Sequence, residues 1–596
     1  MTSIDILRIA ILSQNPTDEQ KDAIFATELE FLLRAAPGSG KTWTSSRRFI
    51  WRGANWPYSS GGLALLSFTN AAIREFKEAT ITLGRSDILS DPNYVGTFDA
   101  FVERFILMPF GHLIIGANQR PKLFLAPRPG DWKNNRLLTY IKTKFNRTIP
   151  VPAWETIPFP QDNKVAYKAS STFGGQELNG ESAVKNLMSL GFYTHSQRVF
   201  WACQLLFKRP HIGKVIARRF PEMIIDEAQD TNTWLLILLD LLRENGTKIT
   251  LVGDPDQCIY EFSMADATSL PSLRDRWNIP EKPLSQSFRC NNQIASAVKI
   301  IGGNDAFSGY GDGSHESHRA YIIRESSKQF SDSIQGFQAI MKQGDLNMAS
   351  AAFICRAHGQ LESVRGEVNY SNLKGKTKLI AKASFLRDCR YDYQQAYKIV
   401  EAIIREVTPN NDFWEQVDEN PDSEKSKAVH LAIWRFIKSP SGLPAVSLHG
   451  GVWIQDLRHG LTELMGDIGI KDIPKLGKLI KKTGLDDAQV SSPLFTEQSE
   501  FPSVRQDTIH QVKGESINSV LVVGSLKFWN SVVKAIDAGE STEDRRLAYV
   551  AMTRARHLLV VALPSGHFDK HLHKWKEWGF DVLSNDNPAT LWKDVL

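Results

Sequence analysis

Phe31-Leu-Leu-Arg-Ala-Ala-Pro-Gly-Ser-Gly-Lys-Thr42 is the stretch that decides the fold of this 596-residue chain. An apolar run leads into a glycine-rich turn, and an amphipathic segment follows, which is the strand–turn–helix order of a phosphate-binding loop. In such a loop, backbone N–H groups close around phosphates, a lysine neutralises the β- and γ-oxygens, and a hydroxyl can ligate Mg²⁺. A solvated glycine-rich loop is the alternative. The residues predicted to hold the phosphates and the metal are Gly38, Ser39, Gly40, Lys41 and Thr42.

Met223-Ile-Ile-Asp-Glu-Ala-Gln-Asp230 is the second decisive stretch, because an apolar strand there delivers adjacent carboxylates at its carboxyl end. Asp226 is predicted to hold Mg²⁺, and Glu227 to orient and deprotonate the attacking water. An acidic loop after a strand is common by itself. Together with the phosphate-binding loop it predicts hydrolysis of a nucleoside triphosphate, with ATP and Mg²⁺ as the ligands.

Composition sets looser bounds. The length suggests about three to five domains. The net charge of +5, from 71 Lys+Arg against 66 Asp+Glu, says little about partners. The longest apolar stretch, 234–242, is interrupted by Asp240 and is too short to span a bilayer, so no membrane association is expected. No signal peptide is visible, and we expect a cytoplasmic protein. Scattered cysteines without a CxxC pair argue against an iron–sulfur cluster, a zinc ribbon or a disulfide framework: Cys203, Cys258, Cys290, Cys355 and Cys389.

Short apolar runs followed by turn residues or helix starts recur along the chain, which is the rhythm of parallel βα units. This predicts an α/β fold. The segments 106–205 and 381–500 break the rhythm, and the second is mostly helical in pattern, so both are interpreted as insertions. The predicted strands are 31–35, 63–68, 223–225, 249–252, 352–355, 520–523 and 558–562.

Further stretches, in this order, make the chain resemble the UvrD/Rep/PcrA group of superfamily 1 helicases along nearly its whole length. The phosphate-binding loop also fits, because its Ala35 matches that group better than the general pattern does. The other stretches are Asn15-Pro-Thr-Asp-Glu-Gln20, Leu66-Ser-Phe-Thr-Asn-Ala-Ala72, Gly96-Thr-Phe-Asp-Ala-Phe101, Val252-Gly-Asp-Pro-Asp-Gln-Cys-Ile-Tyr-Glu-Phe262, Gln286-Ser-Phe-Arg289, Thr508-Ile-His-Gln-Val-Lys-Gly-Glu515 and Arg546-Leu-Ala-Tyr-Val-Ala-Met-Thr-Arg-Ala-Arg556.

The resemblance assigns roles around ATP. Gln20 would read the adenine edge, Phe288 would pack against the base, and Glu515 would bind the ribose. Gln257 would sense the γ-phosphate, as the uncharged Gln229 also can. Arginines from remote sequence suit the far wall of the cleft, where they can raise the hydrolysis rate by roughly 10³ to 10⁵. These are Arg289 and Arg554.

The resemblance also implies a single-stranded or tailed DNA substrate and 3′→5′ movement. Aromatic side chains stack on bases without reading their sequence, which suits a motor. Core packing is the alternative for each aromatic. The stacking candidates are Phe68, Tyr260 and Phe262, and the candidates for other DNA contacts are Asn70, Thr97 and His510.

The same resemblance predicts two RecA-like parallel-sheet cores, 1A and 2A, carrying largely helical insertions, 1B and 2B. Domain 1A would comprise 1–105 and 206–288, with 1B at 106–205. Domain 2A would comprise 289–380 and 501–596, with 2B at 381–500.

Two departures from the family pattern affect residues expected to contact DNA: Asp99, where histidine is usual, and Ser263-Met264, where Arg-Gly is common.

The form of Thr97-Phe-Asp-Ala-Phe-Val-Glu-Arg-Phe and of Val512-Lys-Gly-Glu515 resembles compact helicase subunits of Gabija-type bacterial defence systems. Such subunits act beside an ATPase–TOPRIM nuclease of the OLD type, so anti-phage defence or DNA repair is expected. The alternatives are a DNA-end-sensing ATPase that activates a nuclease with little unwinding, and a nucleotide switch that ignores DNA.

Overall fold

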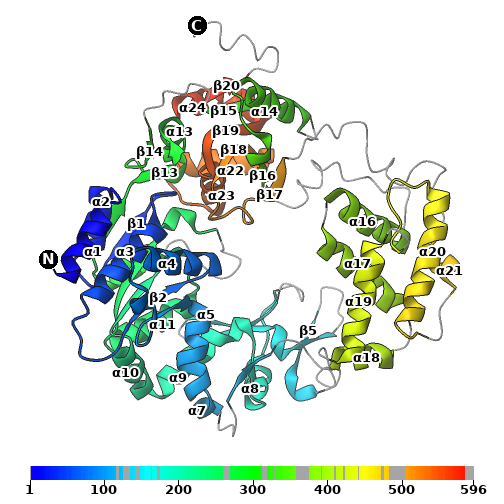
Figure 1. The fold of residues 1–596 in the computed structure, drawn as a ribbon, viewed down its shortest axis with the longest axis horizontal. Coiled ribbons are helices and arrows are strands. Elements are labelled where there is room, and N and C mark those ends of the chain that lie inside the picture. The colour runs from blue at the N-terminus through cyan, green and yellow to red at the C-terminus, as the bar shows by residue number, and fades with distance from the viewer. Residues whose placement is uncertain are drawn as a thin grey trace. The chain divides into compact units, whose positions relative to one another are not determined.

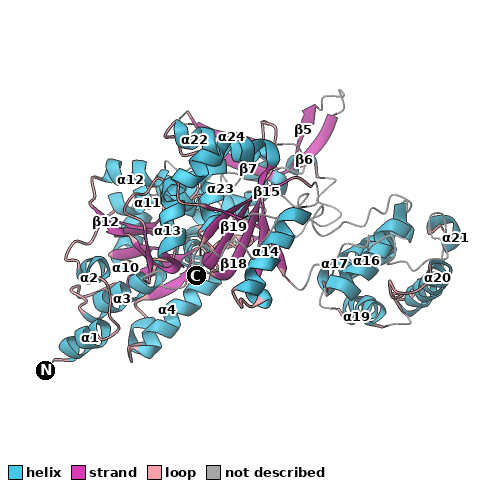
Figure 2. Ribbon diagram, turned by 90° about the horizontal axis from the view of Figure 1, so that it is seen from above, coloured by secondary structure: helices cyan, strands magenta, loops and turns pink. Residues whose placement is uncertain are grey.

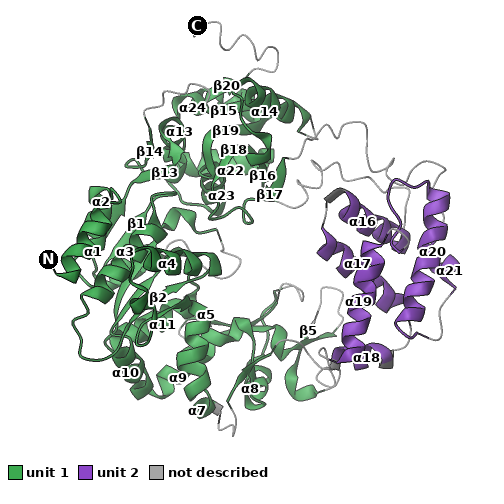
Figure 3. Ribbon diagram, viewed as in Figure 1, with its two compact units in different colours: residues 1–356, 504–596 green, residues 357–503 purple. Residues whose placement is uncertain are grey.

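The computed structural model describes residues 2–115, 120–124, 134–142, 148–162, 164–170, 175–259, 269–311, 319–327, 330–356, 375–390, 392–408, 411–419, 423–439, 442–470, 475–481 and 504–583. The chain forms two compact units. One comprises 1–356 with 504–596, and the other comprises 357–503 (Figure 3). The first unit contains two parallel sheets with helices around them, which we call the first and second lobes.

The sheet of the first lobe has six strands, all parallel, in the order β12-β1-β11-β10-β2-β3. Alternate residues of one strand pack into different cores: Leu63 and Leu65 face one cluster, and Ala64 and Leu66 face the other. Both faces of the sheet are therefore covered, as a parallel sheet requires. The strands are β1 (Leu32–Ala35), β2 (Leu63–Ser67), β3 (Tyr94–Thr97), β10 (Glu222–Ile225), β11 (Lys248–Gly253) and β12 (Glu281–Leu284).

Two sets of helices cover this sheet (Figure 1). Thr2 and Thr17 cap the first two helices, each with a reciprocal capping box, so those helices start where the sequence supplies a cap. One face is covered by α1 (Ser3–Leu12), α2 (Asp18–Phe25), α3 (Lys41–Ala54) and α4 (Asn70–Thr82). The other is covered by α5 (Phe98–Phe101), α9 (Arg198–Lys208), α10 (Pro210–Arg219), α11 (Thr233–Glu244) and α12 (Ser269–Trp277).

The segment 106–205 contains more strand than the predicted helical insertion. Its two antiparallel ribbons, β5–β6 and β7–β8, are rich in proline and β-branched residues, which disfavour helix. The chain runs through a π-helical turn (Val102–Leu107), α6 (Met108–Phe110), α7 (His112–Ile115), β4 (Lys122–Leu123), β5 (Leu138–Lys142), β6 (Thr148–Pro152), β7 (Thr156–Gln161), β8 (Lys164–Ala169), α8 (Glu181–Ser189) and β9 (Phe192–Tyr193).

The second lobe is built on another parallel sheet, in the order β17-β16-β18-β19-β15-β20. Its strands are β15 (Ala320–Glu325), β16 (Ala351–Cys355), β17 (Arg505–Thr508), β18 (Ile517–Val523), β19 (Ala555–Pro564) and β20 (Asp581–Leu583). Its helices are α13 (Asn292–Gly302), α14 (Ser331–Gln343), α22 (Leu526–Asp537), α23 (Glu543–Met552) and α24 (Ser565–Glu577), and a small pair, β13 (Gln286–Asn291) and β14 (Ser308–Tyr310), joins it.

The second unit is helical in all its described elements (Figure 2). Its core draws only on its own residues, among them the fully buried Trp453. The helices are α16 (Gly375–Arg390), α17 (Tyr393–Val407), α18 (Asn411–Glu419), α19 (Glu424–Lys438), α20 (Gly450–Asp467) and α21 (Leu476–Leu479). The predicted α/β fold with two parallel-sheet cores is confirmed, while the four-domain boundaries stay a prediction.

Candidate nucleotide site

The phosphate-binding loop joins the end of β1 to the start of α3. Gly38 and Gly40 have φ values of 74° and 81°, in the left-handed region that favours glycine. A Cβ atom at Gly38 would lie 2.4 Å from Cβ of Arg289, so this position also needs glycine for space. Lys41 begins α3 with Thr42 behind it, and both are half-buried. The loop therefore presents the N-terminus of a helix, which favours an anion.

The structure explains why alanine, and not the glycine of the general pattern, occupies position 35. Ala35 is the last residue of β1, pairs with Leu284 of β12, and is completely buried in the first-lobe core. A methyl group fills this position, so the glycine of the general pattern is not needed here.

Gln20 lies under the loop. Its side chain is 4% exposed, Nε2 donates to the carbonyl of Ser39 at 3.1 Å, and Oε1 accepts from the N–H of Thr17 at 3.0 Å. Both ends of the amide are engaged with the protein, and Gln20 thereby braces the loop. Its predicted contact with adenine stays a prediction.

Strand β13 runs beside the same loop. Ser287 Oγ donates to the carbonyl of Pro37 at 2.8 Å, and the N–H of Phe288 donates to the carbonyl of Gly38 at 2.8 Å. The Phe288 ring is 46% exposed, although it adjoins the loop. An exposed aromatic ring there is available for stacking on a base, as predicted for Phe288.

Asp226 follows β10 and is completely buried. Its N–H donates to the carbonyl of Leu66 at 2.8 Å, while neither carboxylate oxygen has a hydrogen-bond partner among the residues that the structure describes. Burial, and then the nearby Glu227, raise the pKa of Asp226. A carboxylate buried without partners is costly to ionise unless a cation binds it, and its hard oxygen atoms suit Mg²⁺. The unpartnered oxygens of Asp226 therefore suit the predicted metal role, and the role of the Thr42 hydroxyl stays a prediction.

Glu227 has φ of 55°, a strained value for a residue with a side chain. Its Oε2 lies 3.0 Å from Nζ of Lys41 and also accepts from the amide of Gln229. Burial alone would raise the pKa of Glu227, but Lys41 and Lys513 together lower it. The carboxylate is thus kept ionised, as the predicted general base must be.

A chain of amides and carboxylates continues from Glu227. Gln229 accepts from the N–H of Asp254 at 3.1 Å, and Gln257 donates to Asp254 Oδ2 at 2.7 Å. Gln257 Oε1 then accepts from Nη2 of Arg554, in the second lobe, at 3.3 Å. The chain connects the predicted base of one lobe to the predicted arginine of the other.

Arg289 and Arg554 stand together on the second lobe. Arg289 Nε donates to Ser516 Oγ at 2.8 Å, and Nη1 to the carbonyl of Thr553 at 3.3 Å. Arg554 is completely buried, and Nε donates to the carbonyl of Val550 at 2.8 Å. Burial lowers the pKa of Arg289, and burial followed by Arg289 lowers the pKa of Arg554 to about 9. A buried cation beside a half-buried one is relieved by an anion between them, such as a γ-phosphate.

Further contacts cross between the lobes. Lys513 Nζ lies 2.5 and 2.7 Å from the carboxylate oxygens of Asp230, and both side chains are largely buried. Burial raises the pKa of Asp230 to about 6, although Lys513 opposes the shift. Two more such contacts are Arg546 Nε to the carbonyl of Cys258 at 2.7 Å and His510 Nε2 to the carbonyl of Ile259 at 3.1 Å.

Glu515, the predicted ribose ligand, forms an ion pair with Arg505, whose Nη2 lies 2.9 Å from Oε1. Its backbone carbonyl accepts from Arg554 at 3.3 Å. The residue therefore lies next to the predicted arginine, while its contact with a ribose stays a prediction.

The predicted DNA contacts are more scattered. Phe68 is half-buried and stacks on Phe98, with ring centroids 6.0 Å apart, so core packing already uses one face. Asn70 is exposed at the first position of α4, and Thr97 caps α5 by accepting from Ala100 at 3.2 Å. Tyr260, Phe262 and the Ser263-Met264 departure lie outside the described residues.

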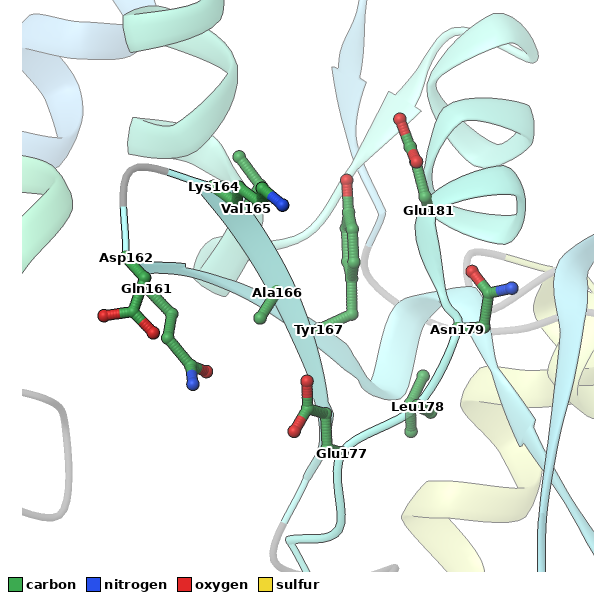
Figure 4. A pocket seen from close by; sticks show the side chains of 10 residues that line it. All are labelled: Gln161, Asp162, Lys164, Val165, Ala166, Tyr167, Glu177, Leu178, Asn179 and Glu181. Carbon is green, nitrogen blue, oxygen red and sulfur yellow. The ribbon is translucent and has the colours of Figure 1, made fainter.

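Two cavities lie away from the predicted site residues. A cavity of 750 Å³ adjoins the β7–β8 ribbon and the start of α8, where Tyr167, Glu177 and Glu181 line it (Figure 4). Another, of 600 Å³, is lined by Arg243 and Trp277, among others. No predicted site residue lines either of them. Within the described ranges, no group of three or more His, Cys, Asp or Glu could hold a metal ion.

Comparison with known families agrees with this geometry. The model of the UvrD/REP helicase N-terminal domain matches residues 16–145 and 161–278, and the model of the UvrD-like helicase C-terminal domain matches 454–565. The chain belongs to the UvrD/REP helicase family.

Relatives within that family are distant. The chain is 24% identical to DNA helicase II of Escherichia coli over 49% of its own length, and 24% identical to the ATP-dependent DNA helicase PcrA of Bacillus subtilis over 47%. It spans 41% and 38% of those proteins. A probable DNA helicase II homologue of Mycoplasma pneumoniae is 21% identical over 92% of this chain and 84% of that protein.

Several residues of this UvrD/REP site were not predicted individually. Asp254 links the two glutamines, and Asp230 pairs with Lys513 across the lobes. All three lie inside motif stretches that the sequence already singled out. A charged residue inside a motif stretch is therefore the signal that could have found each of them, although its partner is visible only in three dimensions. No described helix is long and apolar enough to cross a membrane.

Proposed function

We propose that this UvrD/REP family member hydrolyses ATP with Mg²⁺ and uses the energy to move 3′→5′ along single-stranded DNA and to unwind tailed duplexes. The observation that carries the proposal is the hydrogen-bonded chain that runs from Lys41 and Glu227 through Gln257, all in the first lobe, to Arg554 in the second. A γ-phosphate in such a seam would contact groups of both lobes, so binding and hydrolysis would change how the lobes meet.

The residues divide the work. The bound metal would supply charge neutralisation for the phosphates. Asp226 and Thr42 would hold it, and Lys41 would leave Glu227 for the phosphate oxygens. Glu227, then free and ionised, would take a proton from the attacking water, and Arg554 would stabilise the charge that develops on the transferred phosphate.

Substitution of the lysine and the glutamate tests this proposal. Lys41→Ala and Glu227→Gln should each lower DNA-stimulated ATP hydrolysis by at least about 10³-fold while the circular dichroism spectrum stays unchanged. The two should differ in nucleotide binding, because Lys41→Ala removes a phosphate contact and Glu227→Gln does not. Retained turnover in a clean preparation of either variant would contradict the site.

Separate experiments test whether the protein unwinds DNA, in which direction it moves, and whether it acts with a nuclease. Strand displacement should proceed on a 3′-tailed duplex and fail on a 5′-tailed one. If ATP hydrolysis responds to DNA ends but displacement is absent until an OLD-type nuclease is added, the chain is instead a regulatory subunit of a defence nuclease. ATP hydrolysis that ignores single-stranded DNA would contradict both.

A further inference from the structure

An ion pair sits at the start of α5, next to a predicted DNA contact. Asp99 lies two residues after Thr97, and its carboxylate is 61% exposed. Arg198, the first residue of α9, is only 3% exposed, and its Nη1 lies 2.8 Å from Asp99 Oδ2. The exposed member of the pair is therefore the anion, and the cation is buried beneath it.

Arg198 is held in place from several sides. Its Nη2 lies 2.9 Å from Nδ1 of His195 and 4.0 Å from a carboxylate oxygen of Glu103. Its Nε has no hydrogen-bond partner among the described residues. One guanidinium thus faces two carboxylates, Asp99 and Glu103, on the helical segment that begins after Thr97. Among the described residues, Arg198 is the only cation that forms an ion pair with either carboxylate.

We infer that Arg198 is a positioning residue for DNA: by neutralising Asp99 from below, it allows the phosphate backbone to pass α5. The inference rests on the proposed function, since it concerns the same DNA track. A phosphate within a few ångströms of an unpaired carboxylate is repelled strongly, and this repulsion weakens in salt. Arg198 therefore aids DNA binding by neutralising Asp99, and does not itself contact a phosphate.

Binding of a fluorescein-labelled oligothymidylate, followed by anisotropy at low and high salt, tests this. Arg198→Gln should weaken binding about tenfold at low salt and much less at high salt. Adding Asp99→Asn to that variant should restore the affinity to within about twofold of wild type. ATP hydrolysis without DNA should stay unchanged in all variants. Arg324→Gln, which breaks the exposed Arg324–Asp569 pair between β15 and α24, is the control and should bind normally.

The outcomes separate the two proposals. A wild-type chain that does not bind oligothymidylate contradicts the proposed function itself. Normal binding by wild type and by Arg198→Gln overturns the inference, as does a loss that Asp99→Asn fails to restore, because Arg198 would then act only through the fold. If Arg198→Gln does not fold, Asp99→Asn alone decides: binding at low salt should tighten severalfold, and unchanged affinity overturns the inference.

Discussion

Asp226 is a costly residue to fold. A carboxylate without hydrogen-bond partners among the described residues destabilises the folded state wherever it is ionised. The cost makes sense if the side chain is kept for a ligand. At this position the residue that function needs lowers the stability of the folded state, as is common at binding sites.

Asp226→Asn should therefore stabilise the free protein by about 1–3 kcal/mol while abolishing Mg²⁺-dependent ATP hydrolysis. Because the folded pKa of Asp226 is raised, the folded state binds its proton more tightly than the unfolded state does. The contribution of Asp226 to stability then falls as pH rises above the ordinary carboxyl range. The gain from Asp226→Asn should grow from acid to neutral pH in urea unfolding without nucleotide. A variant less stable than wild type at neutral pH would show that the carboxylate is satisfied.

At the scale of elements, the phosphate-binding loop and β13 are in contact although 250 residues separate Pro37 from Ser287. Gly38 is the point of closest approach, because a Cβ there would meet Arg289 and Ser287 at once. The loop thus fixes the position of the strand that carries Phe288 and Arg289.

Gly38→Ala should accordingly disturb both sides of the site. The positive φ and the 2.4 Å contact leave no room for a methyl group, so we expect nucleotide binding to weaken by at least about tenfold and hydrolysis to fall further. Fluorescent ATP-analogue binding and steady-state hydrolysis measure the two effects.

Gly466→Ala is the control, because Gly466 lies within α20 and a Cβ there meets nothing within 4 Å. It should leave nucleotide binding unchanged and stabilise the protein by up to about 1 kcal/mol. Equal behaviour of the two variants would remove the steric argument at Gly38.

The sequence predicts the central strands better than the edges. The runs at 63–68 and 520–523 are confirmed as β2 and β18, because strands buried on both faces are continuously apolar. The edge strands β12 and β17 carry Glu281-Lys-Pro-Leu284 and Arg505-Gln-Asp-Thr508, which give no such signal. For the nucleotide site, each motif predicts residues that belong to a single lobe. Ion pairs that join the lobes, such as Lys513–Asp230, depend on tertiary packing that no local sequence pattern contains.

At the scale of the molecule, the chain forms two units with separate cores, and the sequence of the first unit is interrupted by that of the second. The core of the helical unit contains only residues between 380 and 480, and the described nucleotide-site contacts lie wholly in the other unit. Arg356 follows β16 and Val504 precedes the neighbouring β17, so the helical unit is inserted between adjacent parallel strands. A crossover between such strands needs a dozen or more residues.

Replacing 357–503 by a glycine–serine linker of about 12 residues should therefore leave the two lobes folded. Calorimetry should show the loss of one unfolding transition, because separate cores unfold separately. ATP hydrolysis should persist within a fewfold of wild type, since the seam residues stay in place, and Lys41→Ala in the shortened chain should abolish it. If the shortened chain unfolds, or folds without hydrolysing ATP, the two units depend on each other for stability or for closure of the seam.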